Sequence, residues 1–413
     1  MTFDVFNTTL GDLSFGGKGY YGIGASAVPY SPELYTYLRI TDINDDGTLN
    51  MSDLKSVADE KASDYLLNTN DIVFARTGAS TGRNYFYDGT DGEFVFAGFL
   101  IKFSLDPSKV NPRYIKYHCQ SQVYRDWIAA FNTGSTRGNI NAQTLASMPI
   151  SLPDRETQDR IVKILDSLEN KRRCNKQIND NLLRQAQLLF QSWFVDYQPF
   201  GGQMPNDWIE GVFADIVDFS NGYAFKSKEL LDTPQPDCYR VFKQGHIFRG
   251  GGFNPDGTKS WYPCCKAEGL KKYVLKKGDI LMAMTDMKDN VQILGNTAIM
   301  EVDDQYIVNQ RVGVLRCKKE RGISYPYIFL LTNSKDFLLN LRSRANSGVQ
   351  VNLSSTEIKN SPVCIAPRHV YDEFTAIVLP MFEAMISNDI QNQQLAELRD
   401  TLLPKLMGGE LSI

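Results

Sequence analysis

Arginine and hydroxyl side chains gather in one short segment of this chain of 413 residues. Arg76 and Arg83 bracket a loop of glycine, serine and threonine, which offers backbone N–H groups, hydroxyl groups and two guanidinium groups. Such groups suit phosphate oxygens, and a guanidinium can also donate two hydrogen bonds to one base edge. The alternative interpretation is an ordinary hairpin loop. The candidate residues are Arg76, Thr77, Ser80, Thr81 and Arg83.

Two further segments add polar and aromatic side chains that suit the same ligand. Ser135, Arg137 and Asn139 follow an expected helix, and Arg and Asn side chains can each make two hydrogen bonds to a base edge. Tyr20 and Tyr21 lie in a glycine-rich segment, where their rings could stack on sugars or bases. The alternatives are a helix C-cap with its turn in the first case and partly buried aromatic side chains in the second.

These segments have counterparts because the sequence repeats itself. Asn70–Thr77 recurs as Gly278–Thr285, and Tyr114–Ile115 recurs as Tyr327–Ile328. The repeat is too long for a solenoid unit, so it predicts two homologous domains. The loops of the two copies differ, as two different targets would require. The candidate residues of the second copy are Tyr223, Lys226, Thr285, Lys288, Arg342, Arg344, Asn346 and Gln350.

Catalytic chemistry finds little support in this sequence. With three histidines in the chain, a metal cluster or a Ser/His/Asp set would need a chance assembly of scattered residues. The segment Gly16–Gly19 lacks the spacing of a phosphate-binding P-loop. Among acidic residues Asp71 repeats as Asp279, and capping of a strand turn explains this pair better than catalysis. We therefore expect no catalytic residue, metal or cofactor on this chain.

Each copy mixes short β-type runs with turns and one helix that a proline begins. The predicted fold class is α/β (α+β), with two homologous globular domains joined by two long antiparallel, coiled-coil-like helices in a pseudo-twofold arrangement. The expected domains are 1–153 and 201–367, and the expected helical segments are 154–200 and 368–413. The expected elements within the domains are strands at Tyr35–Ile43, Ile72–Ala75, Glu93–Phe103, Ile280–Ala283, Thr297–Val302 and Ile307–Arg316, and helices from Pro112 to about Phe131 and from Pro326 to about Arg342.

The long segments after each domain have apolar residues at heptad spacing. Such seams predict two helices of about 50–60 Å that pack antiparallel, with Leu182, Leu395 and Trp193 at the interface. Asn175 and Asn388 occupy equivalent a positions, where an Asn costs stability but fixes register. The alternative is that the seam frays there and both are solvated. The a and d positions are Ile161, Ile164, Leu168, Ile178, Leu182 and Leu189 in one segment, and Phe374, Ile377, Met381, Leu395, Leu398 and Leu402 in the other.

Composition favours a globular protein in a reducing compartment. The chain is 42% hydrophobic and 22% charged, with a net charge of −4, so any affinity for nucleic acid would depend on local patches. Seven cysteines without a CxxC pair suit a reduced, cytoplasmic setting. We expect no secretion signal and no membrane span, because no apolar run reaches the required length.

Two short motifs close the two long segments. They are Leu188–Asp196, with the sequence LLFQSWFVD, and Leu402–Leu411, with the sequence LLPKLMGGEL. Together with the GDIL block at Gly278–Leu281 and the order domain, helix, domain, helix, they resemble the DNA specificity subunits of type I restriction–modification systems. The resemblance covers essentially the whole chain.

This resemblance implies a non-catalytic subunit that binds double-stranded DNA. Each recognition domain would bind one half of a bipartite, asymmetric site, and the helices would set the spacing and dock two methyltransferase subunits. Endonuclease and translocase subunits would complete a complex for phage defence. S-adenosylmethionine and ATP with Mg²⁺ are expected on those partners. Two rival hypotheses are a scaffold that bridges two protein ligands and an enzyme with duplicated catalytic domains.

Overall fold

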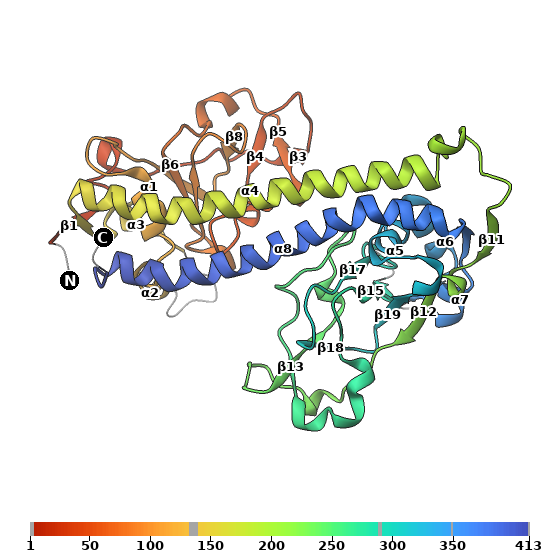
Figure 1. The fold of residues 1–413 in the computed structure, drawn as a ribbon. Coiled ribbons are helices and arrows are strands. Elements are labelled where there is room, and N and C mark those ends of the chain that lie inside the picture. The colour runs from red at the N-terminus through yellow and green to blue at the C-terminus, as the bar shows by residue number, and fades with distance from the viewer. Residues whose placement is uncertain (1–3, 132–138, 288–290, 348–349, 412–413) are drawn as a thin grey trace. The chain divides into compact units, whose positions relative to one another are not determined.

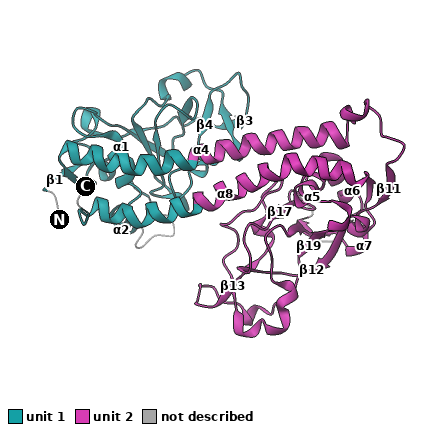
Figure 2. Ribbon diagram, viewed as in Figure 1, with its two compact units in different colours: residues 1–172, 393–413 teal, residues 173–392 magenta. Residues whose placement is uncertain are grey.

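The computed structural model describes residues 4–131, 139–287, 291–347 and 350–411. It divides into two compact units (Figure 2). Unit 1 comprises Met1–Arg172 with Gln393–Ile413, and unit 2 comprises Arg173–Asn392. Each unit contains one copy of the sequence repeat together with parts of two long helices. The predicted fold class is confirmed.

Unit 1 is built on two four-stranded sheets, with strand orders β2-β9-β6-β7 and β3-β5-β4-β8. Figure 1 labels β6 of the first sheet and β3, β4, β5 and β8 of the second. Strand β6 is buried along its whole length between the antiparallel strands β7 and β9. A separate pair joins β1 to β10. The strands are β1 Val5–Thr9, β2 Tyr20–Tyr21, β3 Ala27–Pro29, β4 Thr36–Leu38, β5 Lys55–Val57, β6 Asp71–Ala75, β7 Asn84–Tyr87, β8 Phe94–Phe96, β9 Leu100–Ser104 and β10 Pro149–Pro153, and the short helices are α1 Pro112–His118, α2 Gln122–Ala129 and α3 Ala142–Ala146.

Unit 2 repeats this plan with a four-stranded sheet in the order β12-β19-β15-β17. Two three-stranded sheets, β14-β13-β18 and β16-β21-β20, and the pair β11-β22 complete it. The strands are β11 Ile209–Val212, β12 Val217–Asn221, β13 Cys238–Phe242, β14 Trp261–Pro263, β15 Ile280–Ala283, β16 Thr285–Met287, β17 Thr297–Ile299, β18 Tyr306–Val308, β19 Val312–Cys317, β20 Asn346–Ser347, β21 Gln350–Asn352 and β22 Pro362–Ile365, and the short helices are α5 Tyr325–Thr332, α6 Lys335–Ser343 and α7 Ser355–Lys359.

Two helices of 40 residues each, α4 Arg155–Phe194 and α8 Arg368–Met407, run through both units. Within each unit the first half of one helix packs beside the second half of the other, so the pair is antiparallel, as predicted. In unit 1, Ile161 of α4 shares a core with Leu406 of α8. In unit 2, Phe190 of α4 lies 6.5 Å from Phe374 of α8, measured between ring centroids.

The prediction that all a and d residues of a strict heptad lie at the helix interface is wrong for three of them. Ile178, Ile377 and Leu398 are at least 40% exposed, although the heptad places them at the interface. On α8 the buried side chains include Val378 and Phe382, which pack into the core of unit 2. Because this helix contacts the globular part of the unit as well as α4, its buried face differs from a two-helix seam.

Each expected domain helix is in fact a pair of helices. The break between α1 and α2 falls where Ser121 caps the second helix, accepting a hydrogen bond from the backbone N–H of Tyr124 (3.3 Å). Ser334 does the same for Phe337 (3.4 Å) between α5 and α6. A serine N-cap stabilises a fresh helix start, which the apolar pattern alone did not reveal.

The central strands at Ile72–Ala75 and Ile280–Ala283 are confirmed, but the four other expected strands are shorter or divided. The expected strand Thr297–Val302 ends at Ile299. Glu93–Phe103 splits into β8 and β9, and Ile307–Arg316 splits into β18 and β19. The region Tyr35–Ile43 contains β4 and then a 3₁₀ turn at Ile40–Asp42. The two divided runs, Glu93–Phe103 and Ile307–Arg316, each cross from one sheet to another.

The repeated aspartates lie where the central strands begin, since Asp71 is the first residue of β6 and Asp279 immediately precedes β15. Asp71 and Asp279 are buried, and each accepts the N–H group of the residue three positions earlier. Lys102 Nζ lies 3.1 Å from the Asp71 carboxylate, and Arg316 donates two hydrogen bonds of 2.8 Å to the Asp279 carboxylate. These contacts fit the structural capping role inferred from the sequence.

Candidate nucleic-acid interface

Separate segments of unit 1 meet at the end of β6. Arg76 follows this strand, donates its backbone N–H to the Phe99 carbonyl (3.0 Å) and accepts the N–H of Ile140 (2.9 Å). Thr77 pairs with Asn139 through an isolated antiparallel bridge. The Arg76 loop and the end of the second candidate segment therefore lie side by side, although they are far apart in the sequence.

Tyr20 and Tyr21 join this cluster from β2. The Arg76 guanidinium lies 4.9 Å from the centre of the Tyr21 ring, and the Tyr21 hydroxyl accepts the backbone N–H of Ala142 (3.2 Å). Lys18 Nζ lies 5.3 Å from the centre of the Tyr20 ring. Both tyrosines remain more than 40% exposed. Because consecutive residues of a strand point to opposite faces of the sheet, these are two separate pairs of one ring and one cation. The chemistry of each pair suits base stacking and phosphate binding.

The other residues of the Arg76–Arg83 loop mainly hold the loop together. Arg83 Nε donates to Asp45 (2.6 Å), and Arg83 Nη1 donates to the Ile43 carbonyl (3.2 Å). The Thr81 hydroxyl donates to the Gly78 carbonyl (2.8 Å). Ser80 ends the 3₁₀ turn Gly78–Ser80 and is half-buried. The two bracketing arginines therefore differ, because Arg83 is engaged by Asp45 while Arg76 lies over an exposed ring.

Unit 2 repeats the same backbone frame with other side chains. Met284 donates its N–H to the Arg311 carbonyl (3.1 Å) and accepts the N–H of Leu353 (2.9 Å). Thr285 pairs with Asn352 in the ladder between β16 and β21. Met284 and Arg311 therefore occupy the positions of Arg76 and Phe99, and Thr285 occupies the position of Thr77.

Asn221, rather than Tyr223, occupies the place of Tyr21 in unit 2. Its side-chain oxygen accepts a hydrogen bond from the Ser355 hydroxyl (3.1 Å), at the start of α7, as Tyr21 binds the start of α3. Tyr223 corresponds to Ile23, since both donate their N–H groups to the parallel neighbouring strand. Tyr223 is half-buried and its ring packs against two aromatic neighbours, whereas Lys226 is exposed.

The two candidate arginines that follow α5 are engaged within unit 2. Arg342 donates to the Leu294 carbonyl (2.9 Å), and Arg344 donates to the Asn360 carbonyl (3.2 Å). Asn346 is exposed at the start of β20. Ser135, Arg137, Lys288 and the side chain of Gln350 lie outside the part of the chain that the structure describes.

Sequence reasoning missed Phe99 and Arg311, which occupy equivalent positions at the same turn of the two units. Phe99 is 61% exposed and Arg311 is exposed. Each immediately precedes an apolar strand, β9 or β19, so an alignment of the two copies on these strands would have revealed the exchange of an aromatic ring for a cation. Lys243 and Gln244, which lie near Arg311, were also missed.

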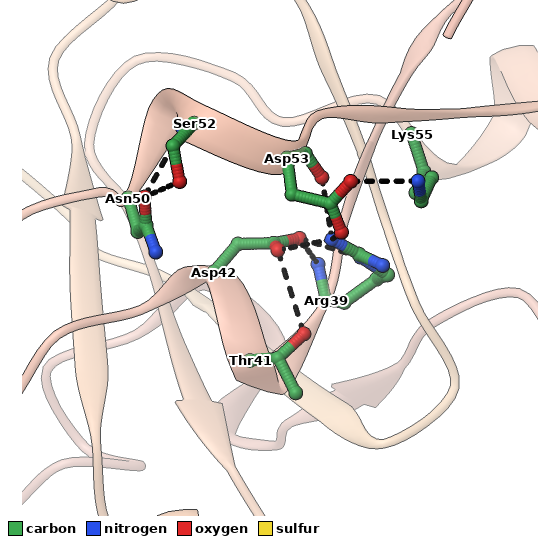
Figure 3. Close-up of polar contacts among 7 residues, drawn as sticks. All are labelled: Arg39, Thr41, Asp42, Asn50, Ser52, Asp53 and Lys55. Carbon is green, nitrogen blue, oxygen red and sulfur yellow. Dashed lines mark hydrogen bonds and ion pairs between the residues drawn. The ribbon is translucent and has the colours of Figure 1, made fainter. Parts of the chain in front are cut away.

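Arg39 anchors a loop of unit 1 whose spacing resembles a calcium-binding loop (Figure 3). Asp42, Asn44, Asp46, Gly47 and Asp53 match the EF-hand pattern except for Asp at its last position. The Arg39 side chain, however, donates to both Asp42 oxygens (2.9 and 2.6 Å), and Lys55 Nζ pairs with Asp53 (2.7 Å). The equivalent loop of unit 2 repeats the backbone contact with Lys243 and His246. The cluster therefore braces a loop, and no group of metal ligands was found among the described residues.

Asparagines bridge α4 and α8 within unit 2. Asn175 Nδ2 donates to Gln391 Oε1 (2.8 Å) and Asn392 Oδ1 (3.0 Å), and Asn388 Nδ2 donates to Asn179 Oδ1 (2.8 Å). Asn175 is fully buried, so the solvated alternative is wrong for this residue. The two predicted asparagines each bond to a neighbour of the other across the helix pair.

Two of the other predicted interface residues lie between packed elements. Leu182 and Trp193 pack against the core of unit 2, and the Trp193 ring lies 5.7 Å from that of Phe374. Leu395 is half-buried on α8.

One pair of equivalent carboxyl groups differs strongly between the units. Burial raises the pKa of Glu301 to about 8, and the Asp389 carboxylate adds to this effect. Burial would also raise the pKa of Asp88, the equivalent residue of unit 1, but hydrogen bonds from Thr90 and the nearby Arg113 guanidinium hold this pKa below its ordinary value. Arg113 lies 2.8 Å from the Asp88 carboxylate.

No helix among the described residues is both long enough and apolar enough to cross a membrane. The exposed cations, amides and aromatic rings at the two equivalent loop clusters are instead the chemistry of a nucleic-acid interface.

Comparisons with known proteins agree with one another. Residues 25–184 and 205–399 match the family model for the type I restriction modification DNA specificity domain. The chain is 23% identical to the type I restriction enzyme HindI specificity subunit of Haemophilus influenzae, over 83% of this chain and 86% of that protein. It is 24% identical to the MjaIX specificity subunit of Methanocaldococcus jannaschii, over 73% and 69% of the two chains. The crystal structure of an S subunit from M. genitalium shares the fold, with a TM-score of 0.55, 17% identity and coverage of 98% and 96%.

Proposed function

Because this chain belongs to the type I restriction–modification DNA specificity family, we propose that it is the DNA specificity subunit of such a complex. It is a non-catalytic component that directs the enzymes of the complex to their site. Each of its recognition domains binds one half of a bipartite, asymmetric sequence in double-stranded DNA.

The observation that carries this proposal is a set of backbone hydrogen bonds at the ends of β6 and β15 that is the same in both units. We call this set the frame. The backbone bonds of Arg76 recur at Met284, while the side chains at these positions and at Phe99 and Arg311 differ. Two recognition domains that bind different half-sites would be expected to share backbone geometry and to differ in their side chains.

The residues proposed to contact DNA fall into two groups. In unit 1 the strongest candidate is the exposed ring of Tyr21 with the half-buried Arg76 beside it, which Thr77 and Asn139 adjoin. The exposed ring of Tyr20 lies next to Tyr21 on β2. Arg83, Arg342 and Arg344 support the loops, since their guanidinium groups are already engaged. The remaining candidates are Ser80, Thr81, Ser135, Arg137, Tyr223, Lys226, Thr285, Lys288, Asn346 and Gln350.

We propose that α4 and α8 set the spacing of the half-sites and dock two methyltransferase subunits. A helix of 40 residues is about 60 Å long, which exceeds the ~34–36 Å between half-sites one DNA turn apart. Exposed apolar side chains on these helices, Ile178 and Leu188 on α4 and Ile377 on α8, offer a docking surface.

The partners would supply the chemistry of the complex. The methyltransferase subunits would bind S-adenosylmethionine, and the endonuclease and translocase subunits would bind ATP with Mg²⁺. The assembled complex would act in the cytoplasm, where reduced cysteines such as those of this chain persist.

Co-expression of the chain with its methyltransferase subunit, followed by genome-wide mapping of methylated adenine, tests this function. We expect one bipartite motif and DNA binding that weakens with salt. Arg76→Ala should relax the sequence requirement in one half of the motif. An assembled complex that adds no methylation and binds DNA without sequence preference would contradict the proposal, and a scaffold for two protein ligands would then be favoured.

The asparagine bridge would fix the register of the helix pair. Replacing Asn175 by Leu removes the two hydrogen bonds to α8 and puts an apolar group in a buried position, so alternative alignments of the two helices become accessible. We expect disulfide cross-linking between cysteine pairs placed across α4 and α8 to become less specific in this variant. An unchanged cross-linking pattern would show that other contacts set the register.

A further inference from the structure

Resting on the function proposed above, we propose that Arg311 reads a guanine in the half-site of unit 2 and that Lys243 holds an adjacent phosphate. The two residues belong to one shallow hollow of about 340 Å³. It is lined by Lys243, Gln244, Gly245, Thr258, Asn309 and Arg311.

The hollow is fixed to the frame that the two units share. The Arg311 carbonyl accepts the N–H of Met284 (3.1 Å), and its own N–H donates to Asn309 Oδ1 (3.2 Å). Gln244 Nε2 donates to the Thr285 carbonyl, which ties the opposite side of the hollow to β16. The backbone that carries Arg311 is therefore held in place, although its side chain is exposed.

The charged groups of the hollow are free to bind a ligand. Within the described part of the chain, neither the Arg311 guanidinium nor Lys243 Nζ has an ion pair or a hydrogen bond. Two other arginines of unit 2 are engaged, since Arg316 binds Asp279 and Arg342 binds the Leu294 carbonyl. A guanidinium without internal contacts, carried on a fixed backbone, can bind a base at a lower cost in free energy, because it breaks no contact within the protein on binding.

The chemistry of the lining points to one kind of ligand. Its side chains provide two cations, two amides and a hydroxyl, and no carboxylate is among the six lining residues. The major-groove edge of guanine carries two acceptors, O6 and N7, that a guanidinium can bind together. A lysine ammonium is a compact charge that suits a backbone phosphate.

Unit 1 lacks this arrangement, so the contact would be confined to one half-site. Phe99 stands at the position of Arg311 and carries no charge. Arg39 stands at the position of Lys243, but its guanidinium is bound by Asp42 and lies 3.6 Å from Asp53. The two heads therefore differ in the charge they present at the same place.

The test uses the specificity subunit assembled with its methyltransferase subunits. Wild type, Arg311→Ala, Arg311→Lys and Lys243→Ala are compared by mapping of methylated adenine and by competition binding to duplexes changed at single positions, at several salt concentrations. Arg321→Ala is the matched control, because Arg321 is also exposed but follows the far end of β19.

Arg311→Ala should replace one G by any base in one half of the motif and lower discrimination at that position by about 5- to 150-fold. Arg311→Lys should not restore discrimination, since an ammonium cannot form the paired contact. Lys243→Ala should weaken binding to all DNA sequences equally. It should also reduce the slope of log affinity against log salt concentration by about the value expected for one phosphate contact. An unchanged motif in Arg311→Ala would overturn this inference while leaving the proposed function intact, whereas a wild-type complex without any motif would overturn the proposed function itself.

Discussion

The two recognition domains share their backbone hydrogen bonds at the end of the central strand but not the side chains that these bonds position. In unit 1 Arg76 lies over the ring of Tyr21, whereas the equivalent Met284 of unit 2 is buried in the core and Asn221 replaces the tyrosine. A backbone bond does not depend on the side chain, so the frame can stay constant while the exposed groups change. Conserved geometry thus provides the fold, and exchanged side chains provide the specificity.

The largest difference between the units should be in the stability lost when the last residue of each long helix is replaced by alanine. Phe194, near the end of α4, packs within 6 Å of the rings of Trp208, Tyr327, Tyr371 and Phe374. Its replacement by Ala leaves a cavity in this aromatic cluster, so we expect unit 2 to lose roughly 3–5 kcal/mol. Hydrogen exchange in denaturant, which follows each unit separately, would measure the loss.

Met407 is the matched control, because it holds the equivalent position at the end of α8 and packs only partly buried against the core of unit 1. Met407→Ala should cost less than about 2 kcal/mol, and the loss should be confined to unit 1. Equal losses in the two variants would show that the aromatic cluster is not what distinguishes the two helix ends.

Adding a side chain at the equivalent glycines beside the shared backbone hydrogen bonds should destabilise both units to a similar extent. A Cβ atom added to Gly22 would lie 2.2 Å from the Ala97 carbonyl oxygen, and one added to Gly222 would lie 2.1 Å from the Asn309 carbonyl oxygen. Because a backbone atom must move in each case, we expect Gly22→Ala and Gly222→Ala each to destabilise its own unit by roughly 1–3 kcal/mol. Urea unfolding followed by hydrogen exchange is the measurement.

Gly24 and Gly269 provide the controls, since an added Cβ meets no atom within 4 Å at either position. Their alanine variants should unfold like the wild type. If Gly22→Ala were tolerated while Gly222→Ala were not, the two frames would not be equivalent.

The buried Glu301 of unit 2 and its equivalent, Asp88 of unit 1, should make the stability of the two units change with pH in opposite directions. The pKa of Glu301 is raised by burial to about 8, so the folded unit binds this proton more tightly than the unfolded chain does. The stability of unit 2 should therefore fall by roughly 2 kcal/mol between pH 6 and pH 8. The lowered pKa of Asp88 acts in the opposite sense, so this carboxyl group should reduce the stability of unit 1 only in acid, as pH falls below its unfolded pKa.

Glu301→Gln is the variant that checks this difference. It keeps the shape of the side chain and removes its charge, so the slope of unit 2 stability between pH 6 and pH 8 should largely disappear. A slope that persists in Glu301→Gln would assign the effect to another group, of which Asp389, with a pKa raised by burial to about 6, is the nearest candidate.

Features encoded by local patterns could be predicted from the sequence. The repeat of the Asp71 and Asp279 strands, the apolar period of α4 and α8 and the antiparallel pairing all follow from neighbouring residues. The division of the domain helices at Ser121 and Ser334 was missed although both serines are good N-caps, because apolar residues continue across the break. The burial of Val378 in place of Ile377 depends on the globular part of unit 2, which helix periodicity does not describe.

The candidate site was predictable only in outline. Arg76 and Arg83 look alike in the sequence, yet a distant carboxylate, Asp45, engages Arg83 and leaves Arg76 for the ring of Tyr21. Arg311 carries no motif at all, and its place beside Met284 is set by strand pairing across the sheet. Such long-range partners decide which of several similar side chains is available.

The smallest expected effect tests whether Tyr21 and Asn221 have the same structural role. Each accepts one hydrogen bond at the start of a short helix, from Ala142 in unit 1 and from Ser355 in unit 2. Tyr21→Phe and Asn221→Ala each remove that bond at an exposed site, so each should destabilise its unit by about 0.5–1 kcal/mol in urea unfolding. Tyr21→Phe keeps the ring beneath the Arg76 guanidinium, so half-site specificity should survive in this variant and be lost in Tyr21→Ala. If Tyr21→Phe relaxed the motif as much as Tyr21→Ala, the hydroxyl rather than the ring would be the group that DNA recognition requires.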